Sequence, residues 1–294
     1  MSFKSGFVAI IGRPNVGKST LMNALIKQKV AIVSDKVQTT RNKIQGIYTD
    51  EHNQIIFIDT PGIHKAFHEL GKIMNKEAFS SLNDCEAVIL LVDATKKFGK
   101  GDEFVLSILE KVEAPVFLVI NKVDISTKED INELTNKYKD LYNFKDIIII
   151  SAKDGYNLDT LLNNIKEVLP NGPKYYPDGY YSDHPESFIM AEIIREKVLL
   201  LTEEEVPHSV ATYIERMENI DEESIEISAV IVVERNSQKG IIIGKDGAMI
   251  KKIRQLAQRE IKKIFDSKVR LEIFVRVEKN WRNKHIYLKE LGYK

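Results

Sequence analysis

The chain has 294 residues, which exceeds one typical domain, so we expect two. Lysine plus arginine and aspartate plus glutamate number 43 each, so net charge by itself favours neither a nucleic-acid partner nor a membrane. A single cysteine, Cys85, excludes an internal disulfide and fits a reducing cytoplasm. Apolar runs such as residues 87–92 are far too short to span a bilayer, and the few residues before the first expected strand predict no signal peptide.

Residues 1–170 alternate apolar runs with helical patterns. The runs are rich in β-branched residues and lie at 7–11, 55–58, 88–92, 116–120 and 147–150. This alternation predicts an α/β domain, a mostly parallel sheet with helices on both faces. Ligands of such sheets lie at the carboxyl ends of the strands, so the polar motifs that directly follow each run are the candidates for a site.

The first run leads into the phosphate-loop pattern G-x-x-x-x-G-K-S, and a helical pattern follows. Gly12 and Gly17 leave room for backbone N–H groups to close on phosphate oxygens, with a favourable dipole from the helix N-terminus. Lys18 supplies a positive charge for the β- and γ-phosphates, and the Ser19 hydroxyl is a ligand for Mg²⁺. The predicted loop comprises Gly12, Arg13, Pro14, Asn15, Val16, Gly17, Lys18, Ser19 and Thr20.

Two further segments fit the phosphates and the metal. After the second run come Asp59, Thr60, Pro61 and Gly62, where Asp59 can hold Mg²⁺ through water and the Gly62 amide can meet a γ-phosphate. The loop before that run carries Thr40, whose hydroxyl can reach the metal. The predicted Mg²⁺ ligands are Ser19, Thr40 and Asp59.

Two motifs fit a guanine base. After the fourth run come Asn121, Lys122 and Asp124, and a carboxylate there can accept hydrogen bonds from the guanine N1–H and 2-amino group. Adenine offers neither donor, so such a site rejects it by leaving a buried carboxylate unpaired. After the last run come three residues whose backbone amides can reach the guanine O6: Ser151, Ala152 and Lys153.

Each of these motifs alone is compatible with an ordinary turn. Their shared order along the chain decides, with four of them directly after predicted strands and the Thr40 segment in the loop between the first two. They resemble the motifs of Ras-like GTPases of the translation-factor class. Within that class the phosphate loop, together with Thr39, Thr40 and Arg41, looks like that of the bacterial assembly GTPases.

The resemblance also has consequences for hydrolysis. Where Ras-like enzymes carry a water-positioning glutamine, this chain has Ile63, which cannot orient water, so we expect slow intrinsic turnover. His64 is a weaker candidate base. Some assembly GTPases with the loop asparagine are stimulated by K⁺, which implies that the side-chain carbonyl of Asn15 helps to hold K⁺. The predicted catalytic residues are Asn15, Lys18, Thr40 and Gly62.

A linker and a second domain follow. Four of the eight prolines lie between Pro170 and Ser187, so residues 171–187 are predicted to be an extended, partly packed linker. The second domain, 188–294, begins with a helix over 188–201 and continues with strands at 210–218, 227–234 and 269–277 and a helix at 248–265. We expect Trp281 in the tail to pack on the sheet.

The centre of the second domain is a G-x-x-G turn from Gly244 to Gly247. In KH modules such a turn lets the backbone lie against single-stranded nucleic acid, and two strands before the turn resemble the type II KH order. A plain turn between helices is the alternative, but residues 235–276 carry twelve basic and four acidic residues. This concentration of basic residues suits binding to the phosphate backbone of a nucleic acid, and we expect RNA rather than DNA as the partner. The RNA candidates are Ile243, Gly244, Lys245, Asp246, Gly247, Lys251, Lys252 and Arg254.

Taken together, the chain resembles the Era family over its whole length, including Ser182 with Asp183, residues 191–197 and the ending Leu291-Gly292-Tyr293. The resemblance implies a bacterial cytoplasmic GTPase that binds the 3′ end of small-subunit ribosomal RNA and assists maturation of the small subunit. We expect the chain to be a monomer. It also implies peripheral contact with the inner face of the cell membrane.

Two other classes stay open. One is an RNA-binding scaffold that uses GTP only for stability, which turnover that responds to RNA would exclude. The other is a signalling GTPase whose second domain binds a protein, which steeply salt-dependent RNA binding would exclude.

Overall fold

The computed structural model describes residues 2–36, 39–61, 68–82, 84–221 and 223–293. The chain forms two compact units. The first comprises residues 1–31, 40–66 and 74–183, and the second comprises 32–39, 67–73 and 184–294. Two short segments from the N-terminal half of the chain therefore belong to the second unit.

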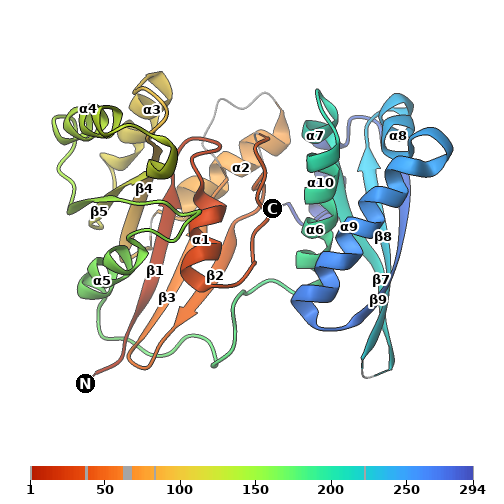
Figure 1. Cartoon of the computed structure of the whole chain (residues 1–294), viewed down its shortest axis with the longest axis horizontal. Coiled ribbons are helices and arrows are strands. Elements are labelled where there is room, and N and C mark those ends of the chain that lie inside the picture. The colour runs from red at the N-terminus through yellow and green to blue at the C-terminus, as the bar shows by residue number, and fades with distance from the viewer. Residues whose placement is uncertain (1, 37–38, 62–67, 83, 222, 294) are drawn as a thin grey trace. The chain divides into compact units, whose positions relative to one another are not determined.

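The first unit is built on a six-stranded sheet in the order β2-β3-β1-β4-β5-β6 (Figure 1). Its neighbouring strands are parallel except for β2, which is antiparallel to β3. The strands are β1 (Lys4–Ile11), β2 (Ile44–Thr49), β3 (Asn53–Asp59), β4 (Ala87–Asp93), β5 (Val116–Asn121) and β6 (Asp146–Ile149). The helices are α1 (Lys18–Ile26), α2 (Glu69–Ser80), α3 (Lys100–Leu109), α4 (Lys128–Lys139) and α5 (Leu158–Val168).

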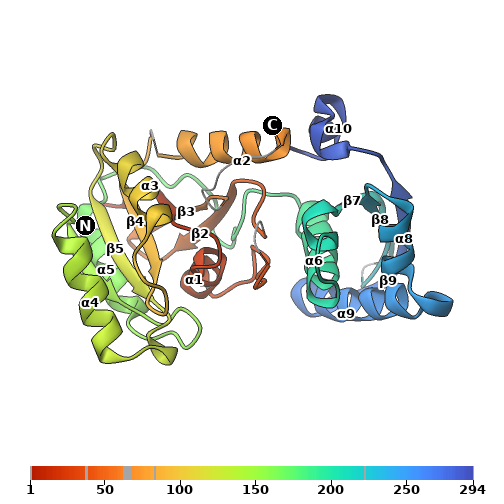
Figure 2. The same ribbon diagram turned by 90° about the horizontal axis from the view of Figure 1, so that it is seen from above.

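Helices cover both faces of this sheet, as the sequence predicts, and α1 and α3 lie on opposite faces (Figure 2). Helix α1 contacts β2 and β3. On the other face, Leu109 of α3 and Tyr138 of α4 share a hydrophobic cluster with Ala9 and Ile11 of β1. Val8 and Ile10, which alternate with these two residues along β1, are also fully buried. Burial on both faces explains why β1 is a continuous apolar run and not an alternating one.

The sequence analysis missed β2, which contains Gly46 and polar residues and so lacks an apolar run. Gly46 lies close against α1: a Cβ there would lie 2.1 Å from Cδ1 of Ile26, so a larger residue would need the Ile26 side chain to move. The linker runs beside this strand: the Ile47 amide donates to the Tyr181 carbonyl at 3.0 Å. This part of the linker therefore packs against the first unit, and α6 begins at Glu186, two residues before the helix predicted over 188–201.

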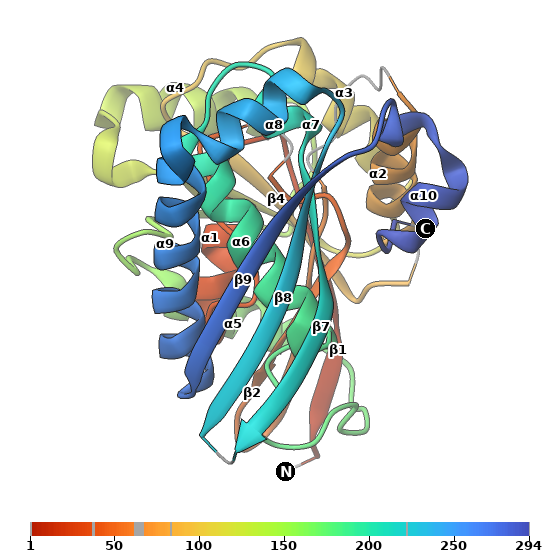
Figure 3. The ribbon, with the colours of Figure 1, turned by 90° about the vertical axis from the view of Figure 1, so that its right-hand side faces the viewer.

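The second unit has a three-stranded sheet in the order β7-β8-β9, covered on one face by α6 and α9 (Figure 3). Strand β7 is antiparallel to β8, and β9 is parallel to it. The elements are α6 (Glu186–Leu201), α7 (Val206–Ser209), β7 (Ala211–Asp221), β8 (Ser224–Val233), α8 (Asn236–Ile243), α9 (Ala248–Phe265), β9 (Lys268–Val277) and α10 (His285–Glu290). Two strands precede the glycine turn, which is the order expected for a type II KH domain.

The core of the second unit joins α6, α9 and β8. It also contains Ile32, from the segment 32–39, at 2% exposure. Trp281 is fully buried, and its Nε1 donates to the Ser209 carbonyl of α7 at 2.9 Å. That it packs on the sheet itself stays a prediction. Among the helices of the described residues, none has both the length and the apolarity to cross a membrane.

Candidate functional site

Three hydroxyl and carboxylate groups meet beside the phosphate loop. Ser19 in the first turn of α1 donates to Oδ2 of Asp59, the last residue of β3, at 2.6 Å. Thr40 Oγ1 lies 2.9 Å from Ser19 Oγ and 3.2 Å from the same Asp59 oxygen. The other oxygen, Asp59 Oδ1, is buried without a hydrogen-bond partner among the described residues. Oxygen donors with an orphaned carboxylate atom fit a Mg²⁺ ion.

The electrostatics of this cluster also fit a metal and a phosphate. Burial raises the pKa of Asp59, an effect that the charge of Lys18 partly opposes. Burial lowers the pKa of Lys18, and the charge of Asp59 partly opposes this effect. Two buried groups whose charged forms are disfavoured gain from ligands of opposite charge. Here Lys18 Nζ donates to loop carbonyls, at 3.1 Å to Arg13 and 3.4 Å to Gly12.

The loop glycines are required by close approach. At Gly12 a Cβ would lie 2.3 Å from the Leu91 carbonyl oxygen. At Gly17, whose φ is +102°, a Cβ would lie 2.4 Å from Nδ2 of Asn121. The backbone can therefore pass close to β4 and β5 before it enters α1 at Lys18, and the N-terminus of a helix is a favourable place for an anion.

Asn121 at the end of β5 links the phosphate loop to the last motif. Its Nδ2 donates to the Val16 carbonyl and its Oδ1 accepts from the Ala152 amide, both at 2.9 Å. Ser151 in turn donates to Oδ1 of Asp124 at 2.8 Å. The structure thus brings the predicted phosphate and base motifs together at the carboxyl ends of adjacent strands, with Asn121 as their connection.

Lys122 contacts Asp93, a residue that the sequence analysis missed. Its Nζ donates to Oδ2 of Asp93 at 2.6 Å and to the Asn15 carbonyl at 2.7 Å. Although burial by itself raises the pKa of Asp93, hydrogen bonds from Lys122 and Thr95 hold it below its ordinary value. Asp93 is the last residue of β4, so the rule that polar groups follow strands was the signal that could have identified it.

The remaining predicted residues have varied positions. Arg13 directs its guanidinium away from the loop to Asp102 of α3, at 2.9 Å, a second residue that the sequence analysis missed. Thr60 donates to the Ile10 carbonyl at 2.9 Å and so ties β3 to β1. Pro61 is buried, Pro14 and Thr20 are half-buried, and Asn15 and Lys153 are exposed. Gly62, Ile63 and His64 lie outside the described residues.

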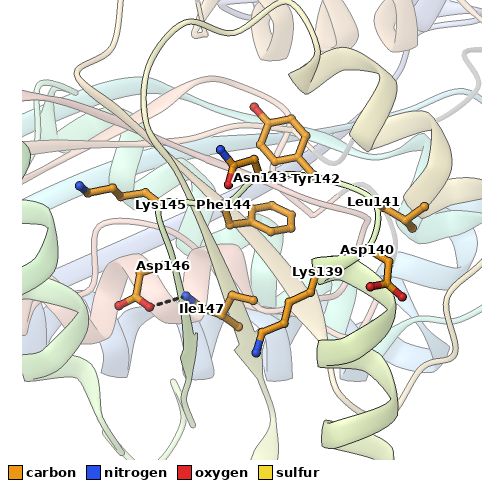
Figure 4. Close-up of a pocket in the computed structure, with 9 residues that line it drawn as sticks. All are labelled: Lys139, Asp140, Leu141, Tyr142, Asn143, Phe144, Lys145, Asp146 and Ile147. Carbon is orange, nitrogen blue, oxygen red and sulfur yellow. Dashed lines mark hydrogen bonds between the residues drawn. The ribbon is translucent and has the colours of Figure 1, made fainter.

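A hollow of about 640 Å³ lies elsewhere on the first unit and is not part of this site (Figure 4). It is lined by residues 139–147, from the end of α4 to the start of β6. The nucleotide motifs follow the carboxyl ends of the strands, whereas this hollow precedes the amino end of β6.

The second unit presents a candidate nucleic-acid interface at the glycine turn. Gly244 and Gly247 have φ values of +73° and +75°, and Asp246 between them is also left-handed at +51°. Helix α9 begins directly after the turn and buries Ile253, Ala257 and Ile261 against the core. On its other side it exposes basic residues. The exposed predicted residues are Lys245, Asp246, Lys251, Lys252 and Arg254, and Ile243 is half-buried.

Comparisons with known proteins agree with both halves of this description. A family model for 50S ribosome-binding GTPases matches residues 7–122, and one for KH domains matches residues 205–282. A crystal structure of Era in complex with MgGDPNP and nucleotides 1506–1542 of 16S ribosomal RNA is 37% identical, with a TM-score of 0.95. The similarity covers 99% of each chain. The chain belongs to the Era family.

A second Era structure, a variant from Aquifex aeolicus bound to GDP and AlF₄⁻, is 38% identical over 99% of each chain, again with a TM-score of 0.95. The Era likeness therefore extends over both the GTPase and the KH units. The predicted family, the α/β GTPase fold and the KH domain that follows it are confirmed.

Proposed function

We propose that this chain is a guanine-nucleotide switch that hydrolyses GTP to GDP and phosphate and binds single-stranded RNA at the 3′ end of small-subunit ribosomal RNA. In this proposal it assists maturation of the small ribosomal subunit. The observation that carries it is the presence, in one chain, of converging GTPase motifs and a glycine turn that opens a basic helix. The Era complex with GDPNP and 16S ribosomal RNA supports the pairing of these two ligands.

For the nucleotide, we propose that the phosphate loop cradles the phosphates, with Lys18 pairing their charge and Gly62 reaching the γ-phosphate. Ser19 and Thr40 would hold Mg²⁺ directly, and Asp59 would hold it through water. The orphaned Asp59 Oδ1 supports this assignment. When bound, Mg²⁺ supplies charge stabilisation to the phosphates.

For the base, we propose that Asp124 accepts from the guanine N1–H and 2-amino group. The hydrogen bond from Ser151 supports this role because it fixes one carboxylate oxygen of Asp124. The amides of the segment 151–153 would meet the guanine O6. This segment is held in turn by the bond between the Ala152 amide and Asn121.

For hydrolysis, we propose slow intrinsic turnover, with K⁺ held near Asn15 as the source of additional positive charge. Asn15 supports this hypothesis by its place in the loop, with an exposed side chain and a left-handed backbone at φ +64°. A cation beside the phosphates stabilises the charge that develops in the transition state.

For the RNA, we propose that its backbone lies on the turn from Gly244 to Gly247 and that its phosphates meet Lys245, Lys251, Lys252 and Arg254. Exposure of these basic groups beside the turn supports the assignment. We further propose that the chain acts as a monomer in the cytoplasm. Peripheral contact with the inner face of the membrane stays a prediction from the family resemblance.

The test is crosslinking in cell lysate in the presence of GTP or GDP, followed by sequencing of the bound RNA, with turnover measured with and without that RNA. We expect reads concentrated at the 3′ end of small-subunit ribosomal RNA and turnover that responds to it. Turnover indifferent to RNA would favour the scaffold alternative. Capture of a protein and no RNA would favour the signalling alternative.

A further inference from the structure

The segment 32–39 leads directly to the metal-site residue Thr40, yet it is part of the second unit. Ile32 lies in the core of that unit, packed with residues of α6 and β8. The Val33 amide donates to Oε1 of Glu196 in α6 at 2.9 Å. The segment is therefore fixed at its beginning by apolar burial and by a bond to a carboxylate.

Its end is fixed by Arg195. Arg195 is fully buried in α6, and its Nη2 donates to the carbonyl oxygen of Thr39. Glu192, one turn earlier, orients the guanidinium through two hydrogen bonds, 2.7 Å from Nε and 2.5 Å from Nη2. Burial by itself lowers the pKa of Arg195. The charge and the hydrogen bonds of Glu192 raise it, and with other nearby charges they outweigh burial, so the net pKa lies above the ordinary value.

The carbonyl that Arg195 holds belongs to the peptide group that joins Thr39 to Thr40. A peptide group is planar, so holding its oxygen restricts the orientation of the whole group and with it the position of the Cα of Thr40. Thr40 then places its hydroxyl 2.9 Å from Ser19 and 3.2 Å from Asp59. Arg195 holds a backbone carbonyl, so the type of residue at position 39 does not reveal this contact.

We propose that Arg195 is a positioning residue for Thr40, and that through the Thr39 carbonyl it sets the affinity for Mg²⁺-bound GTP and the rate of hydrolysis. The inference rests on the proposed role of Thr40 as a metal ligand. Because Thr40 is proposed both as a Mg²⁺ ligand and as a catalytic residue for GTP hydrolysis, we expect loss of the Arg195 contact to weaken GTP more than GDP. A charge-assisted hydrogen bond is worth roughly a tenfold change in an equilibrium constant, which sets the size of the effect.

The experiment uses the full chain with Arg195→Met, which keeps the volume of the side chain and removes its donors. Affinities for GDP and for a non-hydrolysable GTP analogue are measured with Mg²⁺, together with kcat and KM. We expect analogue affinity and kcat to fall about tenfold while GDP affinity changes less than about twofold. Arg195→Lys keeps the charge and a donating group without the planar fork of the guanidinium, and it should recover part of the loss.

The matched control is Thr202→Val, which removes a buried hydrogen bond to the Val198 carbonyl at the end of the same helix but does not involve 32–39. This variant should lower thermal stability, but it should not change the affinity for the GTP analogue relative to the affinity for GDP. Arg195→Met that leaves analogue affinity and kcat unchanged, or that weakens both nucleotides equally, would overturn the inference. If Arg195→Met does not fold, Glu192→Gln gives the same test, because it loosens the guanidinium without removing it.

Thr40→Ala separates this inference from the proposed function. If Thr40→Ala leaves analogue affinity unchanged, the proposed metal role of Thr40 is wrong. If Thr40→Ala weakens the analogue and Arg195→Met does not, only the inference is wrong. If both do, the double variant should be no worse than Thr40→Ala alone, because the two residues act through one hydroxyl.

Discussion

Arg13 of the phosphate loop and Asp102 of α3 form an ion pair at 2.9 Å, in which the aspartate is nearly buried. The same carboxylate accepts from the Tyr138 hydroxyl of α4 at 2.9 Å and from the Gly99 amide at 3.0 Å. Through this one carboxylate, the phosphate loop is therefore linked to two helices that cover the sheet, α3 and α4. The sequence analysis names Arg13 as a residue of the phosphate loop, and the structure adds that its side chain pairs with α3.

This pair predicts that Arg13→Ala lowers the free energy of unfolding by about 1–2 kcal/mol, because it leaves a buried carboxylate with one partner fewer. Chemical denaturation measures it. The matched control is Lys174→Ala, which removes an exposed ion pair with Asp178 and should change stability by less than about 0.5 kcal/mol. Equal effects of the two substitutions would show that the Arg13 pair contributes nothing particular to the fold.

Base choice gives a second prediction. Asp124→Asn should lower affinity for GTP by at least about 100-fold and improve binding of xanthosine triphosphate, because the amide donates where guanine also donates. Competition binding with both nucleotides measures the exchange. Asp154→Asn is the control, since it removes the same charge from an exposed residue in the neighbouring loop. Similar affinities for ATP and GTP in the unsubstituted protein would contradict the role of Asp124.

The glycine turn gives a third prediction, and the structure shows which of its two glycines is the better position for a substitution. A Cβ at Gly244 would lie 2.7 Å from the Cβ of Met249, whereas at Gly247 it would meet open space. Gly247→Asp should therefore fold, lose RNA binding and keep intrinsic GTP hydrolysis. Gly247→Asn has the same shape and tolerance of positive φ without the charge, so it should lose less. Undiminished RNA affinity in Gly247→Asp would remove the KH assignment of this turn.

Local patterns in the sequence predicted most of the fold. Apolar runs identified five of the six strands of the first sheet, and α9 begins and ends at the residues expected. The signal failed at β2, because an edge strand with Gly46 packed on α1 has no apolar run. Strand ends elsewhere differ by up to three residues, as when β1 begins at Lys4 and not Phe7.

The site was predictable as far as its residues follow strands directly. The connections between motifs were not, because they depend on tertiary contacts. Asn121 bridges Val16 and Ala152, and no local pattern encodes either bond. The clearest case is Ile32, which follows the first helix in sequence yet packs in the core of the second unit. Nothing within a window of neighbouring residues distinguishes it from an ordinary residue in a loop.

The last prediction concerns K⁺ and is tested best with substitutions chosen for the backbone at Asn15. Its φ of +64° makes Ala an ambiguous choice, because Ala would add strain while removing the side chain. Asn15→Gly removes the side-chain carbonyl and permits this φ. Turnover of the unsubstituted protein should be at least about tenfold faster in KCl than in matched NaCl. Asn15→Gly should lose this difference while retaining GDP affinity, and Asn15→Asp, which keeps an oxygen at the same place, should retain part of it. Identical rates of the unsubstituted protein in the two salts would exclude K⁺, and a large loss in His64→Ala would direct attention to the histidine.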